Sequence, residues 1–259
     1  MGFEDTLMTE QNAFVTVSVQ NLCRDFGGTA AVRSVNLELR RGEVLGLLGP
    51  NGAGKTSTLR MLTGNLAPSG GSIDICGVDL LDQPRDAKAY IGYLPETPPL
   101  YQEMTVDEYL RFAAKLHGIR RDEIQAAQDR AKKRCGLSDM SKRLINHLSK
   151  GYQQRVGIAQ AIIHSPEVII LDEPTVGLDP NQIREIRELI RELGTQHSVI
   201  LSTHILPEVE AVCDLVKIMH QGRIVFSETR AGLQEKDTSL ENVFSQLTSG
   251  TETMTSEGV

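Results

Sequence analysis

The most informative stretch of the sequence is a glycine-rich run, GPNGAGKT, at residues 49–56. It fits the pattern G-x-x-x-x-G-K-[ST], in which glycines let the backbone wrap closely around phosphate oxygens and aim its N–H groups at them. Lys55 would add a full positive charge at the β- and γ-phosphates, and the Thr56 hydroxyl would ligate Mg²⁺. The residues expected to contact the nucleotide here are Gly49, Asn51, Gly52, Ala53, Gly54, Lys55, Thr56 and Ser57.

A pair of carboxylates follows the apolar run at residues 168–171. Acidic side chains that leave a buried parallel strand lie at the carboxyl edge of the sheet, where ligands bind. Asp172 is then placed to hold Mg²⁺ through water, and Glu173 to orient or deprotonate an attacking water. Two acids after a strand are by themselves more often a turn or a helix cap, so this interpretation depends on the glycine-rich loop in the same chain.

These motifs need a sheet and helices to position them. The apolar run 44–48 leads directly into the glycine-rich loop, and residues 56–63 predict a helix that ends at Gly64. Runs that are apolar on both faces are typical of central parallel strands, and helices alternate with them here, which predicts an α/β fold. The other expected elements are strands at 15–19, 35–39, 73–75, 91–94, 168–171, 198–202 and 215–219 and a helix at 183–193.

The segment after Pro95 has a different character. Strand signals vanish between residues 105 and 148, and Thr105 with Glu108 three positions later forms the pattern of a capping box. Residues 104–150 carry eleven Lys or Arg and six Asp or Glu, although the whole chain has a net charge of −7. This shift of composition predicts an inserted helical lobe, with most of its charges on solvated helix faces.

Composition excludes several classes of protein. The chain has 259 residues, 40% of them apolar and 24% charged, which are ordinary globular values. A net charge of −7 and a sequence pI of about 5.4 argue against a nucleic-acid-binding surface, so no nucleic-acid partner is expected. No stretch approaches the roughly 18 apolar residues of a membrane span, and the amino terminus has no secretory-signal pattern. Four widely spaced cysteines predict reduced thiols in a cytoplasmic protein.

Further motifs accompany the first two. LSKGYQQR at 148–155 precedes an expected helix, the carboxylate pair lies within ILDEPTVGLDP at 170–180, and STH at 202–204 ends a strand. In this order the motifs resemble those of the ATP-binding cassette (ABC) family, and the similarity covers about residues 15–226. The resemblance implies a P-loop NTPase with a mostly parallel central sheet, an N-terminal antiparallel β-subdomain and an inserted α-helical lobe.

The same resemblance sets the expected domain boundaries. An ABC ATPase domain would occupy residues 14–228, with the helical lobe at about 97–150. A flexible tail at 1–13 would precede it, and a short, partly disordered extension at 229–259 would follow it.

The resemblance also implies that residues outside the first two motifs contact nucleotide. Ser149 and Gly151 match the family's signature, which contacts the γ-phosphate of ATP held by a partner subunit. Lys150 and Tyr152 depart from that signature, because the family has a glycine and a glutamine there. A hydroxyl and an N–H at a helix start still form an anion site, so we do not interpret these changes as loss of activity.

Three more positions take roles from the family. His204 matches the switch histidine that reaches the γ-phosphate, and Asp179 matches the D-loop that crosses the dimer interface. Phe26 stands where the family places an aromatic that stacks on adenine, and phenylalanine keeps the stacking face. From composition alone, a phenylalanine near a strand end is equally well explained as a core residue.

One position departs from the family in a way that bears on metal binding. Glu96 follows residues 91–95 where the family has a glutamine. A carboxylate ligates Mg²⁺ as an amide does, but an ionised carboxylate donates no hydrogen bond and repels the γ-phosphate. Either the coupling of the nucleotide site to the rest of the protein differs here, or the substitution marks a subgroup of the family. The run IGYLPE at 91–96 and SLENVF at 239–244 are similar to the gliding-motility and multidrug-export branch.

The function implied is that of the ATP-hydrolysing subunit of an exporter. Such a subunit binds ATP and Mg²⁺ at a dimer interface with a second cassette, identical or paralogous, and drives separate transmembrane permease subunits from the inner face of the cell membrane. Two alternatives stay open: a soluble ABC ATPase of the translation or DNA-repair type, and an importer subunit. A single cassette, the lack of a coiled coil and the acidic pI favour transport, and the short carboxyl terminus favours export.

The segment at residues 96–116 is the expected contact with a transmembrane subunit. In the family, the stretch after this glutamine position receives a helix of the membrane protein. Leu100, Tyr101 and Met104 look exposed, after breakers at Pro98 and Pro99. The alternative is that these apolar side chains pack inward.

Overall fold

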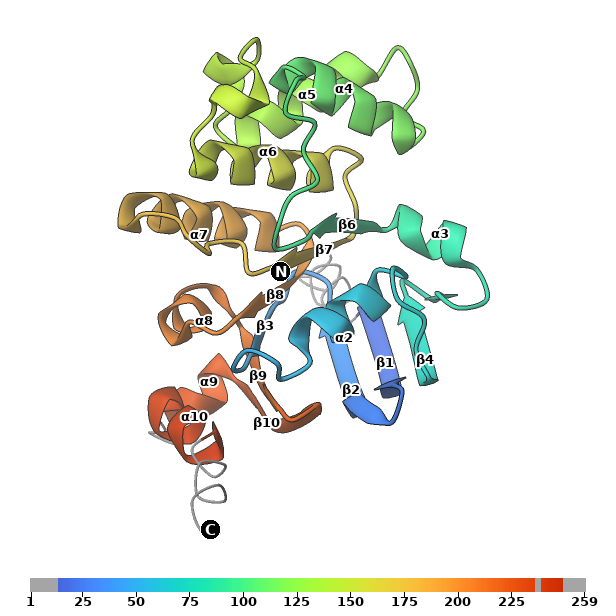
Figure 1. The fold of residues 1–259 in the computed structure, drawn as a ribbon, viewed down its shortest axis with the longest axis vertical. Coiled ribbons are helices and arrows are strands. Elements are labelled where there is room, and N and C mark those ends of the chain that lie inside the picture. Colours follow the sequence, from blue (N-terminus) through green and yellow to red (C-terminus); the bar gives the residue numbers. More distant parts are fainter. Residues whose placement is uncertain (1–13, 236–238, 249–259) are drawn as a thin grey trace, which may run out of the picture.

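The computed structural model describes residues 14–235 and 239–248. The tail predicted at 1–13 and the end of the predicted extension, from 249 on, lie outside the described residues. The chain forms a central sheet with helices on one face and a second sheet on the other (Figure 1). No helix among the described residues is long and apolar enough to cross a membrane.

The central sheet is mostly parallel, as the resemblance implies. Its strand order over the described residues is β10-β9-β3-β8-β7-β6, and only β10 runs antiparallel to its neighbour. The strands are β3 (Val44–Leu48), β6 (Ile91–Leu94), β7 (Val168–Asp172), β8 (Ser198–Thr203), β9 (Leu215–His220) and β10 (Arg223–Thr229).

The second sheet is antiparallel, which confirms the predicted N-terminal β-subdomain. Its order is β2-β1-β4-β5. The strands are β1 (Val15–Phe26), β2 (Thr29–Arg40), β4 (Gly70–Ile75) and β5 (Val78–Asp79). The first two are longer than the sequence pattern predicts, because several register shifts let β1 continue through an irregular stretch.

The helices of the described residues fall into two groups. α2 (Lys55–Leu62) and α3 (Pro84–Ala89) accompany the antiparallel sheet, and the others lie on the opposite side of the central sheet (Figure 1). The second group is α4 (Val106–Leu116), α5 (Ile124–Arg134), α6 (Lys150–Ile162), α7 (Pro180–Gly194), α8 (Leu206–Val212), α9 (Arg230–Glu235) and α10 (Leu240–Thr248), with short 3₁₀ turns at Ser138–Met140 and Ile145–His147. In this group, α4 and α5 pack on α6.

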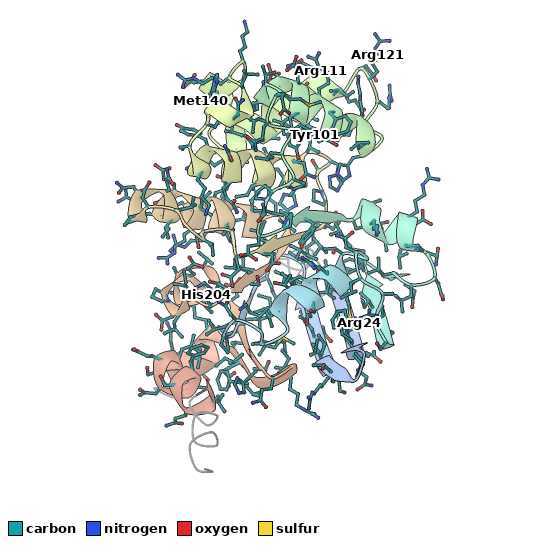
Figure 2. The ribbon with its side chains drawn as sticks, in the orientation of Figure 1. Arg24, Tyr101, Arg111, Arg121, Met140 and His204 are labelled. Carbon is teal, nitrogen blue, oxygen red and sulfur yellow. The ribbon has the colours of Figure 1, made fainter. Side chains whose placement is uncertain are left out.

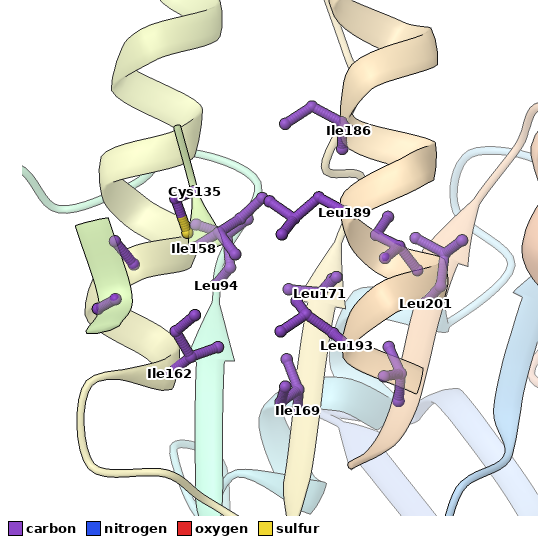
Figure 3. Packing of buried hydrophobic residues seen from close by; sticks show 14 of the residues in the cluster. Leu94, Cys135, Ile158, Ile162, Ile169, Leu171, Ile186, Leu189, Leu193 and Leu201 are labelled. Atoms are coloured by element: carbon purple, nitrogen blue, oxygen red, sulfur yellow. The ribbon is translucent and has the colours of Figure 1, made fainter. Parts of the chain in front are cut away.

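The all-apolar strands supply two hydrophobic cores at once. Successive side chains of a strand point to opposite faces, so β7 sends Ile169 and Leu171 into the helical core and Val168 and Ile170 into the core beneath the antiparallel sheet. Figure 3 shows the helical core around Leu171 and its neighbours on α6 and α7. The same alternation puts Asp172 on the face that carries α2.

The predicted helical lobe is present and is fixed to the sheet through α6. A Cβ built on Gly157 would lie 2.5 Å from Leu94 Cδ1, and one built on Gly92 would overlap the Ala161 carbonyl oxygen. These glycines therefore allow α6 to lie directly on β6. The predicted capping box also forms: Thr105 Oγ1 accepts from the Glu108 N–H (3.2 Å), and Glu108 Oε2 accepts from the Thr105 N–H (2.8 Å).

Two carboxyl-terminal helices complete the fold. The start of the predicted extension forms α9 and α10, and Leu240 of α10 is buried in the helical core. The four cysteines all lie within the described residues and form no disulfide.

A histidine pair joins the lobe to the sheet. The rings of His117, after α4, and His164, after α6, stack with centroids 3.7 Å apart. Burial lowers the pKa of both, and burial followed by the neighbouring His117 lowers that of His164 to about 4. The folded state therefore favours the neutral ring.

We predict that this pair weakens the fold in acid. The unfolded His164, with a pKa of 6.5, binds more protons than the folded one between pH 6.5 and about 4, so stability falls as pH falls through that window. When the pH is lowered from 7 to 5, the unfolding free energy of the parent should fall by about 2 kcal/mol more than that of the His164→Gln variant. Urea denaturation at both pH values measures this, with the exposed His147→Gln as control; equal losses in parent and His164→Gln would contradict it.

Candidate functional site

The glycine-rich loop is held in one conformation by its surroundings. Gly54 caps α2 with φ +105, and a Cβ built there would lie 2.5 Å from the Ala31 carbonyl oxygen and 2.8 Å from Met219 Cε. A residue with a side chain would therefore be strained at this φ and would also clash with these atoms. The Gly222 N–H donates to the Ala53 carbonyl (2.9 Å), which ties the loop to the turn between β9 and β10.

A cavity of about 300 Å³ opens over this loop. It is lined by Ala31, Pro50, Asn51, Gly52, Ala53, Gly54, Lys55, Thr56, Ser57, Glu96, Glu173, Val176 and His204. Gly49 lies beneath it, where its carbonyl oxygen accepts from Lys55. The structure thus brings the predicted loop, both predicted catalytic side chains and Glu96 to one cavity.

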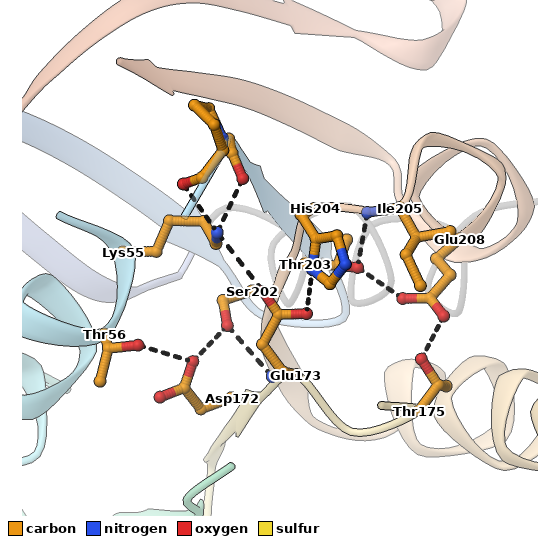
Figure 4. A network of polar contacts seen from close by, with 12 residues as sticks. Lys55, Thr56, Asp172, Glu173, Thr175, Ser202, Thr203, His204, Ile205 and Glu208 are labelled. Atoms are coloured by element: carbon orange, nitrogen blue, oxygen red, sulfur yellow. Dashed lines mark hydrogen bonds and ion pairs between the residues drawn. The ribbon is translucent and has the colours of Figure 1, made fainter. Parts of the chain in front are cut away.

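Lys55 lines the cavity, and Figure 4 shows its ammonium group pointing toward Glu173. Its side chain is only 6% exposed, and its Nζ lies 2.7 Å from the Gly49 carbonyl oxygen, 3.3 Å from that of Pro50 and 3.3 Å from Glu173 Oε1. A buried ammonium held by two carbonyls and a carboxylate is positioned before any phosphate arrives.

Asp172 has the contacts expected of a metal-holding carboxylate. Its Oδ1 accepts from Ser202 (2.5 Å) and from Thr56 at the start of α2 (3.4 Å). Its Oδ2 is buried and makes no hydrogen bond within the described part of the chain. A buried carboxylate oxygen without a partner, beside a threonine hydroxyl, fits Mg²⁺, which prefers oxygen ligands and keeps several waters.

Glu173 and His204 form the other polar pair of the cavity. Glu173 has φ 48, an uncommon conformation for a residue with a side chain, and its N–H donates to the Ser202 hydroxyl (3.2 Å). This turn aims the carboxylate back over the cavity, where Oε2 lies 3.0 Å from His204 Nδ1. Residues 173 and 204 meet because β7 and β8 are neighbouring parallel strands that end together.

Besides Gly49, four predicted nucleotide contacts do not line this cavity. Phe26 lies at the end of β1, 48% exposed, with the Arg24 guanidinium 4.5 Å from its ring centre. Ser149 and Asp179 are the residues that cap α6 and α7: Ser149 accepts from one N–H of its helix and Asp179 from two. Gly151 packs on Gln182, since a Cβ built there would lie 2.5 Å from Gln182 Cδ.

Three residues of the site were not predicted to belong to it, although Val176 and Ser202 lie inside named motifs. Ala31 and Val176 line the cavity, and Ser202 joins Asp172 to the Glu173 backbone. The signal for Ser202 was available, because it lies near the end of an apolar parallel strand, β8, and its Cα pairs with that of Asp172. Ala31 shows nothing in the sequence that indicates a binding role.

Comparison with known proteins decides the family. The family model described as "ABC transporter" matches residues 32–176, more than half of the chain. The chain belongs to the ABC transporter family. NatA of Bacillus subtilis, an ABC transporter ATP-binding protein, is 43% identical over 212 residues, which cover 81% of this chain and 86% of NatA. The bacitracin transport ATP-binding protein BcrA of Bacillus licheniformis is 38% identical, over 81% of this chain and 68% of BcrA.

Solved structures agree with the sequence relatives. The "ATP binding subunit of ABC transporter" superposes with a TM-score of 0.80 at 33% identity, over 90% of this chain and 99% of the other. The predictions of an ABC fold and of a transporter ATPase subunit are confirmed. This protein is thus an ATP-binding, ATP-hydrolysing subunit of an ABC transporter, and the comparisons do not favour the importer alternative.

We predict that Lys55→Ala abolishes tight ATP binding. The variant removes the one cation that lines this cavity among the described residues, and a polyphosphate would lose its charged partner. Affinity should fall about 100-fold or more, consistent with loss of a charge-assisted contact worth about 3 kcal/mol. Calorimetry with ATP measures it, with the exposed Lys115→Ala as control; an unchanged dissociation constant for Lys55→Ala would remove the lysine from this role.

Proposed function

We propose that this cavity binds ATP with Mg²⁺ and that Glu173 and His204 carry the hydrolysis. The observation that supports this most is the convergence of Lys55, Asp172, Glu173 and His204 from three separate segments on the loop that cradles phosphate (Figure 4). Thr56 and Asp172 would hold Mg²⁺, with Glu96 reaching it from the cavity wall. When bound, Mg²⁺ neutralises charge that develops on the phosphate oxygens.

The protein's own groups then divide the chemistry. Water attacks the γ-phosphorus, the bond from that phosphorus to the bridging oxygen breaks, and ADP and phosphate leave. Glu173 orients the water and accepts its proton. Lys55 binds the β- and γ-phosphates, and His204 holds both the γ-phosphate and the Glu173 carboxylate.

The predicted contacts outside the cavity support a second nucleotide-binding chain. Ser149, Gly151 and Asp179 lie at the amino ends of α6 and α7, away from the chain's own cavity. Lys150 lies across Gly177 between them, since a Cβ built on Gly177 would overlap Lys150 Nζ. We infer that this surface completes the ATP site of a second cassette, either the same chain or a paralogue. Phe26 would stack on adenine at the open side of the loop.

The second proposed partner is a transmembrane permease subunit, which would contact the helical lobe. The structure corrects the expected surface, because Leu100 and Met104 are partly buried against the helical core. Tyr101 is 50% exposed and packs edge-on against Tyr109 and Phe112. Of the three apolar residues it is therefore the one that would contact a membrane subunit, and Figure 2 labels it in the lobe. The resemblance to the multidrug-export branch and the relative named for bacitracin transport support export, with this chain at the inner face of the cell membrane.

Glu173→Gln should bind ATP normally and hydrolyse it at least 100-fold more slowly, because the amide keeps the shape of the side chain and loses the base. ATP should then hold two chains together, and size-exclusion chromatography with ATP should show a dimer. Phosphate release measures turnover, and Glu188→Gln, an exposed glutamate of α7, is the control. A Glu173→Gln variant that turns over at the parent rate would remove Glu173 from its role.

Tyr101→Asp should uncouple hydrolysis from transport. Docking would bury the new carboxylate without a partner, which opposes association with the membrane subunit. The nucleotide cavity lies elsewhere in the fold and should not be affected. Basal ATPase activity of the isolated chain should stay within about twofold of the parent, and transport by the reconstituted complex should fall about tenfold. Leu81→Asp changes a similarly exposed apolar residue and is the control. Intact transport with Tyr101→Asp would refute the docking role.

A further inference from the structure

Behind the cavity, a buried glutamate joins the two segments that carry the proposed catalytic pair. Glu208, in the first turn of α8, is 1% exposed. Its Oε2 accepts from the Thr203 hydroxyl (2.6 Å), and its Oε1 accepts from the Thr175 hydroxyl. Figure 4 shows Glu208 between the two threonines, on the far side of His204 from Lys55.

The Thr203 contact fixes the backbone of His204. The Thr203 hydroxyl accepts from the Ile205 N–H (3.0 Å) and donates to Glu208. His204 is the residue between these two, so its backbone lies within a turn closed by a side chain. Glu208 sets the direction of that hydroxyl, because a hydroxyl donates only one hydrogen bond and this one is donated to the carboxylate.

The Thr175 contact fixes the turn that carries Glu173. This turn starts at the positive φ of Glu173, and the Val176 N–H donates back to the Glu173 carbonyl (3.3 Å). Thr175 lies between these residues and is anchored to Glu208 by its hydroxyl. An uncommon backbone conformation persists only where surrounding contacts hold it, and Glu208 supplies one.

A carboxylate buried so deeply needs a compensating charge. Arg187 on α7 places its Nη2 3.9 Å from Glu208 Oε1. Glu208 thus has two hydroxyl donors and a nearby guanidinium that compensate for its burial. A glutamate that served only the dipole of α8 would need none of these distant partners.

We propose that Glu208 is a positioning residue for hydrolysis: it sets the distance between the Glu173 carboxylate and the His204 ring by holding Thr175 and Thr203. This inference rests on the proposed roles of Glu173 and His204. Glu208 does not line the nucleotide cavity, so its effect should fall on turnover and leave ATP binding unchanged. Small misplacements of catalytic groups cost up to about 100-fold in rate.

The test uses variants that remove single hydrogen bonds. Glu208→Gln and Thr203→Val should each lower kcat about tenfold or more and leave KM for ATP within about twofold. Thr203→Ser keeps the hydroxyl and should restore kcat to near the parent value. Glu210→Gln, on the same helix but exposed, is the matched control and should not change kcat.

The possible results separate the two proposals. Parent kcat in folded Glu208→Gln and Thr203→Val, or an equal loss of kcat in Thr203→Ser and Thr203→Val, overturns the positioning role. A raised KM with unchanged kcat also overturns it. If Glu208→Gln does not fold, Thr175→Val and Thr175→Ser decide in the same way. A Glu173→Gln chain that hydrolyses ATP normally overturns the proposed function instead.

Discussion

Lys55 and Glu173 are oppositely charged, almost fully buried, and 3.3 Å apart. Removing two charges from water costs several kcal/mol per ion, and their attraction offsets this only when the geometry is good and the remaining donors are satisfied. The carbonyls of Gly49 and Pro50 meet that need for the ammonium. The pair therefore requires that the end of β3, the start of α2 and the end of β7 be held in fixed relation. An incoming phosphate would compete with Glu173 for Lys55, so binding of a polyanion would weaken this ion pair and leave the carboxylate with His204.

The fold meets this requirement through parallel strands and close packing. β3, β8 and β7 are adjacent and in register, so residues 48, 203 and 172 end at one edge of the sheet. The cavity forms at that edge because the loop, the carboxylates and His204 all follow strand ends. The helical lobe is fixed to the same sheet by α6, where glycines let the helix approach β6. Arg155 of α6 also pairs with Glu185 of α7 (2.5 Å) and donates to the Cys135 carbonyl of the lobe (2.9 Å), so it joins the lobe to α7.

Local pattern was enough to predict the elements that carry these motifs, and the reason is physical. The loop at 49–56 needs its glycines, and the runs 44–48 and 168–171 are apolar on both faces, which is typical of a covered parallel sheet. The antiparallel sheet came from the family resemblance instead, because β1 and β2 pair through irregular registers that alternation does not show. Glu208 had no signal at all. It reads as an exposed acid beside Glu210, and its burial depends on threonines and an arginine that are distant in the sequence. Leu100 and Met104 mislead for the same reason, since exposure is decided by tertiary packing.

The contacts of Glu208 behind the cavity connect α7 to the site, and the sequence of α7 does not indicate this connection. α7 begins at the Asp179 cap, on the surface expected to face a second cassette, and Arg187 two turns later contacts Glu208. Glu208 in turn holds the residues on either side of the cavity pair. A shift of His204 or Glu173 on nucleotide binding would therefore strain contacts that include α7, and α7 reaches the lobe through Glu185. Rigid helices carry such displacements along their length because packed cores resist local deformation. In this arrangement, the cavity, the surface proposed to meet a second cassette and the lobe proposed to meet a membrane subunit share one set of contacts.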